Sequence, residues 1–195
     1  MNGTDADLPQ RIRAQTRPRP ELLTGPRVTL RPLTERDIAP LVEILSHPDL
    51  APWWPIQSEA SVREDLFGDE GGLSLAVERQ GVLIGVVMYS EQLWRDYFSA
   101  GIDIALASDQ RGEGIGPEVL RTLIRWLIDV GGHHRITIDP AASNTRAIRA
   151  YEKVGFRPVG TMRQYERGPD GRWRDGLLMD LLAEEFVDEQ AQRGA

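Results

Sequence analysis

The chain has 195 residues, of which 41% are hydrophobic and 27% charged, and this composition is typical of one soluble globular domain. Its 30 acidic and 23 basic residues give a formal net charge of −7, which disfavours nucleic acid as a partner and either serves solubility alone or attracts a polycation. The chain shows neither an apolar run long enough to span a bilayer nor a secretory signal, so we expect a cytoplasmic protein with no membrane partner. The absence of cysteine excludes disulfides, thiolate metal sites and a cysteine nucleophile, and we expect no metal.

Regular patterns begin after residue 26. Residues 1–25 carry three prolines and scattered charges without a period, so we expect a flexible N-terminal extension ahead of one domain at 26–195. Alternating apolar and polar residues or short apolar runs between turn signals predict strands at 27–33, 73–78, 82–89, 101–107, 134–139 and on both sides of 169–171. Apolar residues spaced three to four positions apart predict helices at 38–45, 59–67, 116–130 and 145–154.

The order of these elements, β-α-α-β-β-β-α-β-α-β-β, indicates the fold class. Strand–helix–strand units place a parallel pair in the centre of the sheet, and hairpins place antiparallel strands on both sides of it. We therefore expect an α/β (α+β) fold with a mixed, mostly antiparallel sheet and helices on both faces.

The segment Arg111-Gly112-Glu113-Gly114-Ile115-Gly116 lies between a predicted strand and the longest predicted helix. Glycines let the backbone turn tightly, and the start of a helix offers free N–H groups and a favourable dipole to an anion, so the segment predicts a pyrophosphate site. A P-loop would need Gly-Lys-Ser/Thr at this helix start, and Gly116-Pro117 supplies neither. A dinucleotide fold would place the glycines after the first strand of a parallel set, whereas three antiparallel-looking strands come first here.

A second motif follows one strand downstream, Asn144-Thr145-Arg146-Ala147-Ile148-Arg149-Ala150-Tyr151-Glu152-Lys153-Val154-Gly155-Phe156. It resembles the signature Asn-x-x-Ala-x-x-x-Tyr-x-x-x-Gly-Phe of the GNAT N-acetyltransferases, and the glycine segment resembles their acetyl-CoA loop. The resemblance covers roughly residues 27 to 183 and implies a GNAT fold whose central parallel pair is splayed around acetyl-CoA, the co-substrate. It also implies cofactor-binding roles for Ile104, Ala105, Leu106, Arg111, Gly112, Glu113, Gly114, Ile115, Gly116 and Asn144.

The roles of Tyr151 and Asn144 have competing interpretations. A phenol is neutral at pH 7, so Tyr151 can donate a proton to the departing CoA thiolate, and the family motif favours this role over core packing. Asn144 is suited both to capping the helix and to reaching the CoA arm. Without a cysteine or a Ser-His-Asp spacing, we expect direct transfer to the amine, with strand N–H groups at 101–107 stabilising the oxyanion.

The acceptor is predicted from Asp103, Asp139 and the pair Trp53-Trp54. Asp103 follows Gly101-Ile102 in the strand before the loop, and strand alternation places it on the face of Gly101 and Ala105. Asp139 ends a strand before a proline, and paired tryptophans in a loop suit a sugar ring or a cation. These features resemble the aminoglycoside 6′-N-acetyltransferases. The resemblance implies a polycationic small-molecule amine as substrate, with Asp103 as base or orienting group and Asp139 binding other ammonium groups. Asp175 either adds a carboxylate to the pocket or decorates a hairpin.

Several residues, and the function itself, have alternative interpretations. For Asp139 the competing interpretation is a turn before Pro140, and for the tryptophans it is core burial. The segment at 91–99 is short for an acceptor-covering insertion, and the run at 170–180 resembles that of protein N-terminal acetyltransferases. The other functions considered are therefore an acetyltransferase of protein N-termini or of another small amine, and a GNAT-fold binding module without turnover. The sequence leaves open whether the protein is a monomer or a homodimer.

Overall fold

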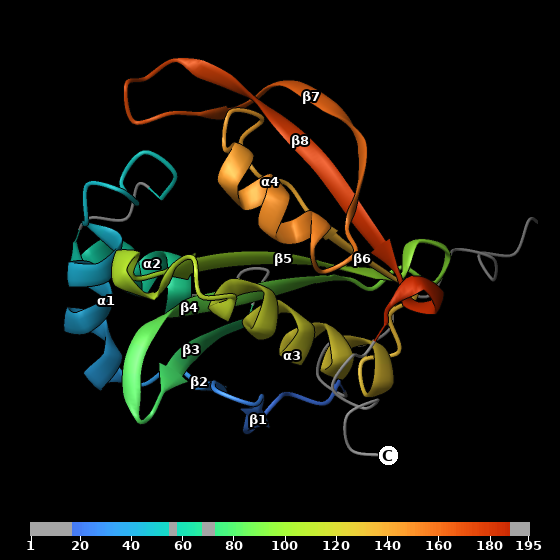
Figure 1. Ribbon diagram of the computed structural model, residues 1–195, viewed down its shortest axis with the longest axis horizontal. Helices are drawn as coiled ribbons and strands as arrows, with labels where there is room; N and C mark the ends of the chain where they lie inside the picture. Colours follow the sequence, from blue (N-terminus) through green and yellow to red (C-terminus); the bar gives the residue numbers. More distant parts are fainter. Residues whose placement is uncertain (1–16, 55–57, 68–72, 188–195) are drawn as a thin grey trace, which may run out of the picture.

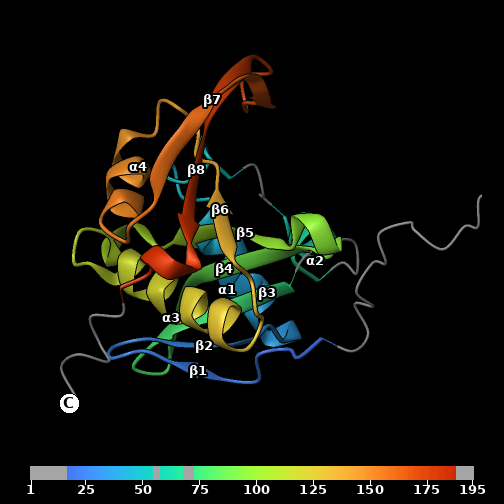
Figure 2. The same cartoon turned by 90° about the vertical axis from the view of Figure 1, so that its right-hand side faces the viewer.

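The computed structural model describes residues 17–54, 58–67 and 73–187, which form one eight-stranded mixed sheet with helices on both faces (Figures 1 and 2). The strands follow the spatial order β1-β2-β3-β4-β5-β6-β8-β7. They are β1 (Leu23–Thr24), β2 (Thr29–Pro32), β3 (Leu73–Arg79), β4 (Val82–Gln92), β5 (Ser99–Leu106), β6 (Arg135–Ile138), β7 (Arg157–Arg167) and β8 (Trp173–Leu182). The helices are α1 (Ile38–Leu45), α2 (Glu59–Phe67), α3 (Ile115–Asp129) and α4 (Thr145–Glu152).

The predicted fold class and element order are confirmed, with one added strand. β1 pairs antiparallel with β2, so regular structure begins before the predicted boundary at residue 26. Of the predicted N-terminal extension, residues 1–16 lie outside the described residues. In the part of the chain that the structure describes, no helix combines the length and the apolar character needed to cross a membrane.

Local signals in the sequence set the helix ends. The Asn144 side chain accepts a hydrogen bond from the Ala147 N–H at 3.2 Å, which caps α4 as predicted. The Ser58 hydroxyl accepts from the Ser61 N–H at 3.1 Å in the same way at α2. α3 ends before Gly132, whose φ of 72° is left-handed and favours glycine.

The sheet carries a hydrophobic core on each face. α3 and α4 cover one face, where Leu120, Leu123 and Tyr151 pack against the sheet. α1 and α2 cover the other face, where Leu41 and Val62 pack. The two cores hold the sheet as the middle layer of three (Figure 1).

β5 contributes to both cores because its side chains alternate between the two faces of the sheet. Ile102 and Leu106 point into the core under α3, and Ala105 points into the core under α1 and α2. Asp103 shares the face of Ala105. The predicted alternation of this strand is therefore confirmed.

The centre of the sheet opens between β5 and β6. These strands are parallel, and their pairing is limited to Ala100 with Ile136 and Gly101 with Thr137. β5 continues along β4 up to Leu106, whereas β6 turns along β8. The two halves of the sheet separate beyond Gly101, so that β6, β7, β8 and α4 stand away from the rest (Figure 1).

The β7–β8 hairpin projects beyond the sheet and carries an irregularity in β7 (Figure 2). The register shifts between Met162 and Glu166, and Gln164 within this bulge has a φ of 51°. The Asp175 carboxylate accepts a hydrogen bond from the Gln164 N–H at 2.8 Å. The bulge therefore bends the hairpin and turns the side chains that follow it.

The link from β2 to α1 depends on a buried ion pair. Asp37 is 4% exposed and accepts hydrogen bonds from Arg31 at 2.7 and 2.8 Å and from the Thr34 N–H at 2.7 Å. The Arg31 guanidinium lowers the pKa of the Asp37 carboxyl below its ordinary value, against the opposing effect of burial. A carboxyl with a lowered pKa stabilises the folded state at neutral pH, and this contribution is lost as the pH falls through the folded-state pKa.

We predict that Asp37→Asn lowers the free energy of unfolding at pH 7 by about 2 kcal/mol, because a charged hydrogen-bonded pair inside the protein is broken. The difference from wild type should shrink as the pH falls into the acidic range. Denaturant unfolding at several pH values measures both effects. Glu35→Gln is the matched control, since the Glu35 ion pair with Arg63 is exposed and contributes little. Equal losses in the two variants would contradict the prediction.

Candidate active site

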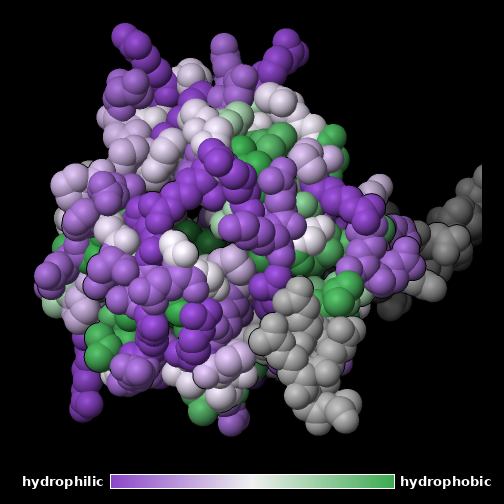
Figure 3. Space-filling model, viewed as in Figure 1, coloured by the Kyte–Doolittle hydropathy of each residue, from purple (hydrophilic) through white to green (hydrophobic). Residues whose placement is uncertain are grey.

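The separation of β5 and β6 leads into a cavity of about 1160 Å³. Its walls come from β5, the start of α3, α4, the loop after α1, and β7. The space-filling view shows a hollow near the middle of this face, with apolar residues at its bottom and polar residues around it (Figure 3). The predicted site residues can therefore be placed relative to one cavity.

The glycine segment forms one end of the cavity. Arg111, Gly112, Gly114 and Gly116 line it, and Gly112 and Gly114 have φ values of 90° and 80°, which L side chains rarely adopt. Gly114 is the N-cap of α3, so the free N–H groups of that helix begin here. Glycine at these positions thus gives both the turn and an open approach to the helix start.

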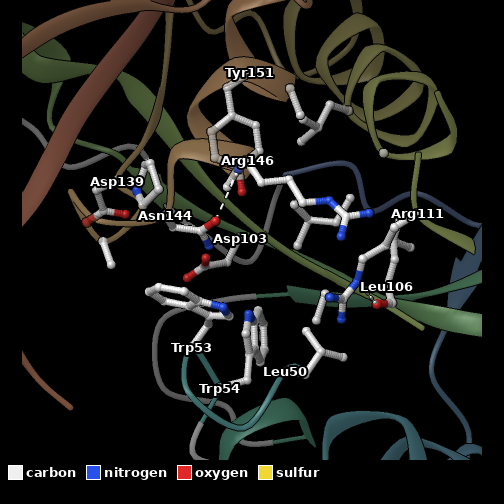
Figure 4. Close-up of a pocket in the computed structure, with 18 of the residues that line it drawn as sticks. Leu50, Trp53, Trp54, Asp103, Leu106, Arg111, Asp139, Asn144, Arg146 and Tyr151 are labelled. Carbon is white, nitrogen blue, oxygen red and sulfur yellow. Dashed lines mark hydrogen bonds between the residues drawn. The ribbon is translucent and has the colours of Figure 1, made fainter. Parts of the chain in front are cut away.

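Two guanidinium groups approach each other beside the glycine segment. Burial and the nearby Arg146 lower the pKa of Arg111. The Arg111 Nε donates to the Leu106 carbonyl at 3.1 Å, whereas its buried Nη2 has no hydrogen-bond partner. Both side chains extend to the same side of the pocket (Figure 4). Repelling cations with an unused buried donor indicate a site for an anion.

β5 presents unpaired backbone groups to the gap. The Ala107 N–H donates to the Ile84 carbonyl of β4 at 2.8 Å, and antiparallel alternation turns the N–H groups of Ile104 and Leu106 away from β4. β6 pairs with β5 only as far as Gly101, so these groups face the cavity. Ile104, Ala105 and Leu106, which were predicted to bind the cofactor, all line it.

Asp103 lies at the centre of the cavity wall (Figure 4). Its carboxyl is open to the cavity, but protein atoms surround it closely. Desolvation, followed by the charges of Asp139 and Glu166, raises the pKa of Asp103 to about 7. This carboxyl therefore changes its charge near neutral pH and can both accept and release a proton there.

Three further groups of the second half of the sheet face Asp103. Asp139, at the end of β6, lines the cavity together with Tyr165 and Glu166 of β7. A hydrogen bond to Asp139, followed by burial, raises the pKa of Tyr165 to about 12, so its hydroxyl keeps its proton. The carboxylates at 103, 139 and 166 converge from separate strands and make this part of the cavity attractive to cations.

The tryptophan loop and the β7–β8 hairpin meet above this acidic region. Trp53 and Trp54 line the cavity, and their indoles point toward Asp103 (Figure 4). The Arg174 guanidinium lies 5.2 Å from the centre of a Trp53 ring and forms an ion pair of 2.9 Å with Glu166. Trp54 also packs against the core under α1 and α2, so both predicted interpretations of the tryptophans apply to it.

Tyr151 points from α4 into the gap on the other side from the tryptophans (Figure 4). The side chain is 9% exposed and packs edge-on against Phe156. Burial, and then the charges of Asp103 and Asp139, raise its pKa above the ordinary value. Tyr151 is thus a core residue whose protonated hydroxyl borders the cavity.

Three of the predicted site residues do not direct their side chains into the cavity. Asp175 is not among the described residues that line the cavity, because its carboxylate holds the β7 bulge at Gln164. The Ile115 side chain is fully buried in the core. The Glu113 side chain turns away to Arg79, at 2.8 Å. Conversely, Tyr165, Glu166 and Arg174 also line the cavity and were not predicted, since no motif marks them; the first two follow the β7 bulge, and Arg174 lies opposite Glu166 in β8.

Comparisons with known proteins agree with this geometry. The model of the acetyltransferase (GNAT) domain matches residues 27–157. An aminoglycoside N(6′)-acetyltransferase type 1 from Klebsiella pneumoniae is 34% identical over 162 residues, which cover 74% of this chain and 79% of the relative.

Solved structures of acetyltransferases are also similar to this chain. The AAC(6′)-Ib structure with coenzyme A and kanamycin is 31% identical, with a TM-score of 0.67 over 81% of this chain and 96% of the other. Mycobacterium smegmatis RimJ with CoA-disulfide is 27% identical, with a TM-score of 0.73 over 88% and 90%. The matched segment runs through the diverging strands, the glycine loop and α4, and the chain belongs to the GNAT acetyltransferases.

Proposed function

We propose that this acetyltransferase transfers the acetyl group of acetyl-CoA to a primary amine of an aminoglycoside, at the 6′ position. The observation that carries the proposal is the convergence of Asp103 and Asp139, beside the Glu166–Arg174 ion pair, in a cavity whose other end is cationic. A polycationic amino sugar suits the acidic part, and the anionic co-substrate suits the arginines and the helix start. The similarity to aminoglycoside N(6′)-acetyltransferase supports the same acceptor.

Acetyl-CoA supplies the acetyl group as a thioester, and the residues present fit its binding. Gly112, Gly114 and Gly116 leave the helix N–H groups open to a pyrophosphate, and the unpartnered Nη2 of Arg111 is available to it. The free N–H groups of β5, at Ile104 and Leu106, are available to the extended arm and to the oxyanion that develops during transfer.

Asp103 is the proposed base or orienting group for the acceptor amine. An amine with a pKa like that of lysine is unprotonated only about one part in a thousand at pH 7, so its proton must leave before attack. A carboxyl with a pKa of about 7 is well matched to accept that proton, directly or through water. Asp139, oriented by Tyr165, then binds another ammonium group.

Tyr151 is the proposed proton donor to the departing thiolate. Its raised pKa keeps the hydroxyl protonated, and it borders the cavity from α4, opposite the tryptophans. Asn144 caps α4 and lines the same cavity, so it holds this helix in place and is available to the CoA arm. The two residues would thus act from one helix on the leaving group and its carrier.

The experiment that tests the function combines purified protein, acetyl-CoA and an acceptor panel of kanamycin, tobramycin, spermidine and a peptide with a free N-terminus. We expect thiol release with the aminoglycosides to exceed that with the other acceptors, because they combine several cations with sugar rings that suit the tryptophans beside the acidic region. Expression in a susceptible bacterium should raise the inhibitory concentrations of the same drugs. Acetylation of the peptide or of spermidine, with no acetylation of the aminoglycosides, would refute the proposed acceptor. The chain would still be an acetyltransferase, but of another amine.

Asp103→Asn tests the proposed base through pH dependence. For wild type, kcat/KM should rise with pH through an apparent pKa of about 7, because the carboxylate is the competent form. In the pH profile of kcat, the corresponding rise (the same step) should lie at lower pH, since the cations of the bound acceptor favour the carboxylate form of Asp103. In Asp103→Asn the step near pH 7 should vanish and turnover should fall. A variant that keeps this step would assign it to another group.

Tyr151→Phe should lower kcat about 10-fold to 100-fold with little change in the KM for acetyl-CoA, because it removes a proton donor and keeps the packed ring. Tyr165→Phe is the matched control. It removes the hydrogen bond to Asp139 and should raise the KM for the aminoglycoside more than it lowers kcat. Steady-state kinetics in both substrates separate the two effects. An unchanged kcat in Tyr151→Phe would mean that this tyrosine only packs in the core and donates no proton.

A further inference from the structure

The turn between β1 and β2 lies against the N-terminal part of α3, behind the glycine loop. The Gly25 N–H donates to the Val28 carbonyl at 2.8 Å and closes the turn. A Cβ at Gly25 would lie 2.7 Å from the Thr122 Oγ1 of α3, a separation that real Cβ atoms do not show. Glycine therefore permits the close approach that brings Arg27 to the start of the helix.

Arg27 contacts both the helix and the loop. Its backbone N–H and its Nε donate to the two carboxylate oxygens of Glu118, at 2.5 and 2.7 Å. Its Nη1 donates to the backbone carbonyl of Glu113 at 3.1 Å. Arg27 is not among the described residues that line the cavity, so it holds the glycine loop from outside.

The negative charge of Glu118 lies where it affects the binding of an anionic ligand. Glu118 is 6% exposed and lies one turn into α3, close to the free N–H groups of the helix start. An unneutralised carboxylate there would oppose the binding of a pyrophosphate at the same helix end. The Arg27 guanidinium neutralises it and leaves the positive end of the helix to the ligand.

A second arginine contacts the loop more weakly. Arg79, at the end of β3, donates to the Gln110 side chain at 3.1 Å and to the Glu113 carboxylate at 2.8 Å. The Glu113 side chain is 54% exposed, and exposed ion pairs contribute little. Arg27 is the stronger contact because its carboxylate partner is buried.

We propose that Arg27 is a positioning residue for acetyl-CoA. It fixes the carbonyl of Glu113 and neutralises Glu118, so that the loop at 111–116 keeps its shape and its affinity for an anion. The proposal rests on the proposed acetyl-CoA site at that loop. If Arg27 acts in this way, the β1–β2 turn contributes to co-substrate binding although it lies outside the cavity.

Arg27→Met tests the proposal by a split between binding and turnover. The KM for acetyl-CoA and the Kd for CoA should rise about tenfold, as expected for the loss of one charged hydrogen-bonded contact, while kcat at saturating acetyl-CoA changes less than twofold. Arg27→Lys keeps the charge without the planar fork and should show a smaller loss. If Arg27→Met does not fold, Arg27→Lys is the variant in which the KM and the Kd are measured.

Glu118→Gln separates neutralisation from loop anchoring. Alone it should bind CoA nearly as wild type does. Combined with Arg27→Met it should recover part of the lost affinity, because the uncompensated charge is gone while the Glu113 carbonyl remains unheld. A double variant as weak as Arg27→Met would overturn the neutralising role.

Arg31→Met is the matched control for a general loss of stability. Arg31 lies in β2, near Arg27, and pairs with Asp37 and Glu78, away from the glycine loop. It should lower the melting temperature without raising the Kd for CoA, measured by calorimetry. Equal losses of CoA affinity in Arg27→Met and Arg31→Met, or an unchanged KM in Arg27→Met, would overturn the proposal. Failure of the wild type to bind CoA would instead count against the proposed function.

Discussion

The short contact between β5 and β6 is the constraint on which the rest of this molecule depends. Parallel strands usually pair along their length, and here the pairing stops after Gly101. The backbone groups beyond that point would be costly if they were buried without partners. They are tolerated because they border a cavity that water or a ligand can fill. The same separation moves Tyr151 and Asp139 to one wall and Asp103 to the other.

Elements with strong local signals could be predicted from the sequence. The glycine spacing at 111–116 and the Asn144 cap act within a few residues of chain, and both lie where predicted. The alternation in β5 placed Asp103 on the correct face for the same reason. β1 was missed because two residues are too few to show a period.

The parts of the site that depend on tertiary shape could not be predicted. Tyr165 and Glu166 follow the β7 bulge at Gln164, a non-glycine residue with positive φ that no turn motif marks, and Arg174 lies opposite Glu166 in β8. Of the two interpretations of Asp175, the structure shows the one on the hairpin, where its carboxylate holds that bulge. The pKa of Asp103 likewise depends on carboxylates more than 30 residues away in the chain, which only the folded sheet brings near.

The charge distribution along the cavity has a consequence for how ligands arrive. Arg111 and Asp139 lie on opposite sides of Asp103 (Figure 4), so the electrostatic potential changes sign along the length of the site. A cationic and an anionic molecule are then drawn to different ends during diffusional encounter, before any shape is matched. Each end also repels the ligand suited to the other, which reduces unproductive occupancy. An overall charge of −7 is thus compatible with local affinity for a polyanion, because charge acts over about 8–10 Å at physiological ionic strength.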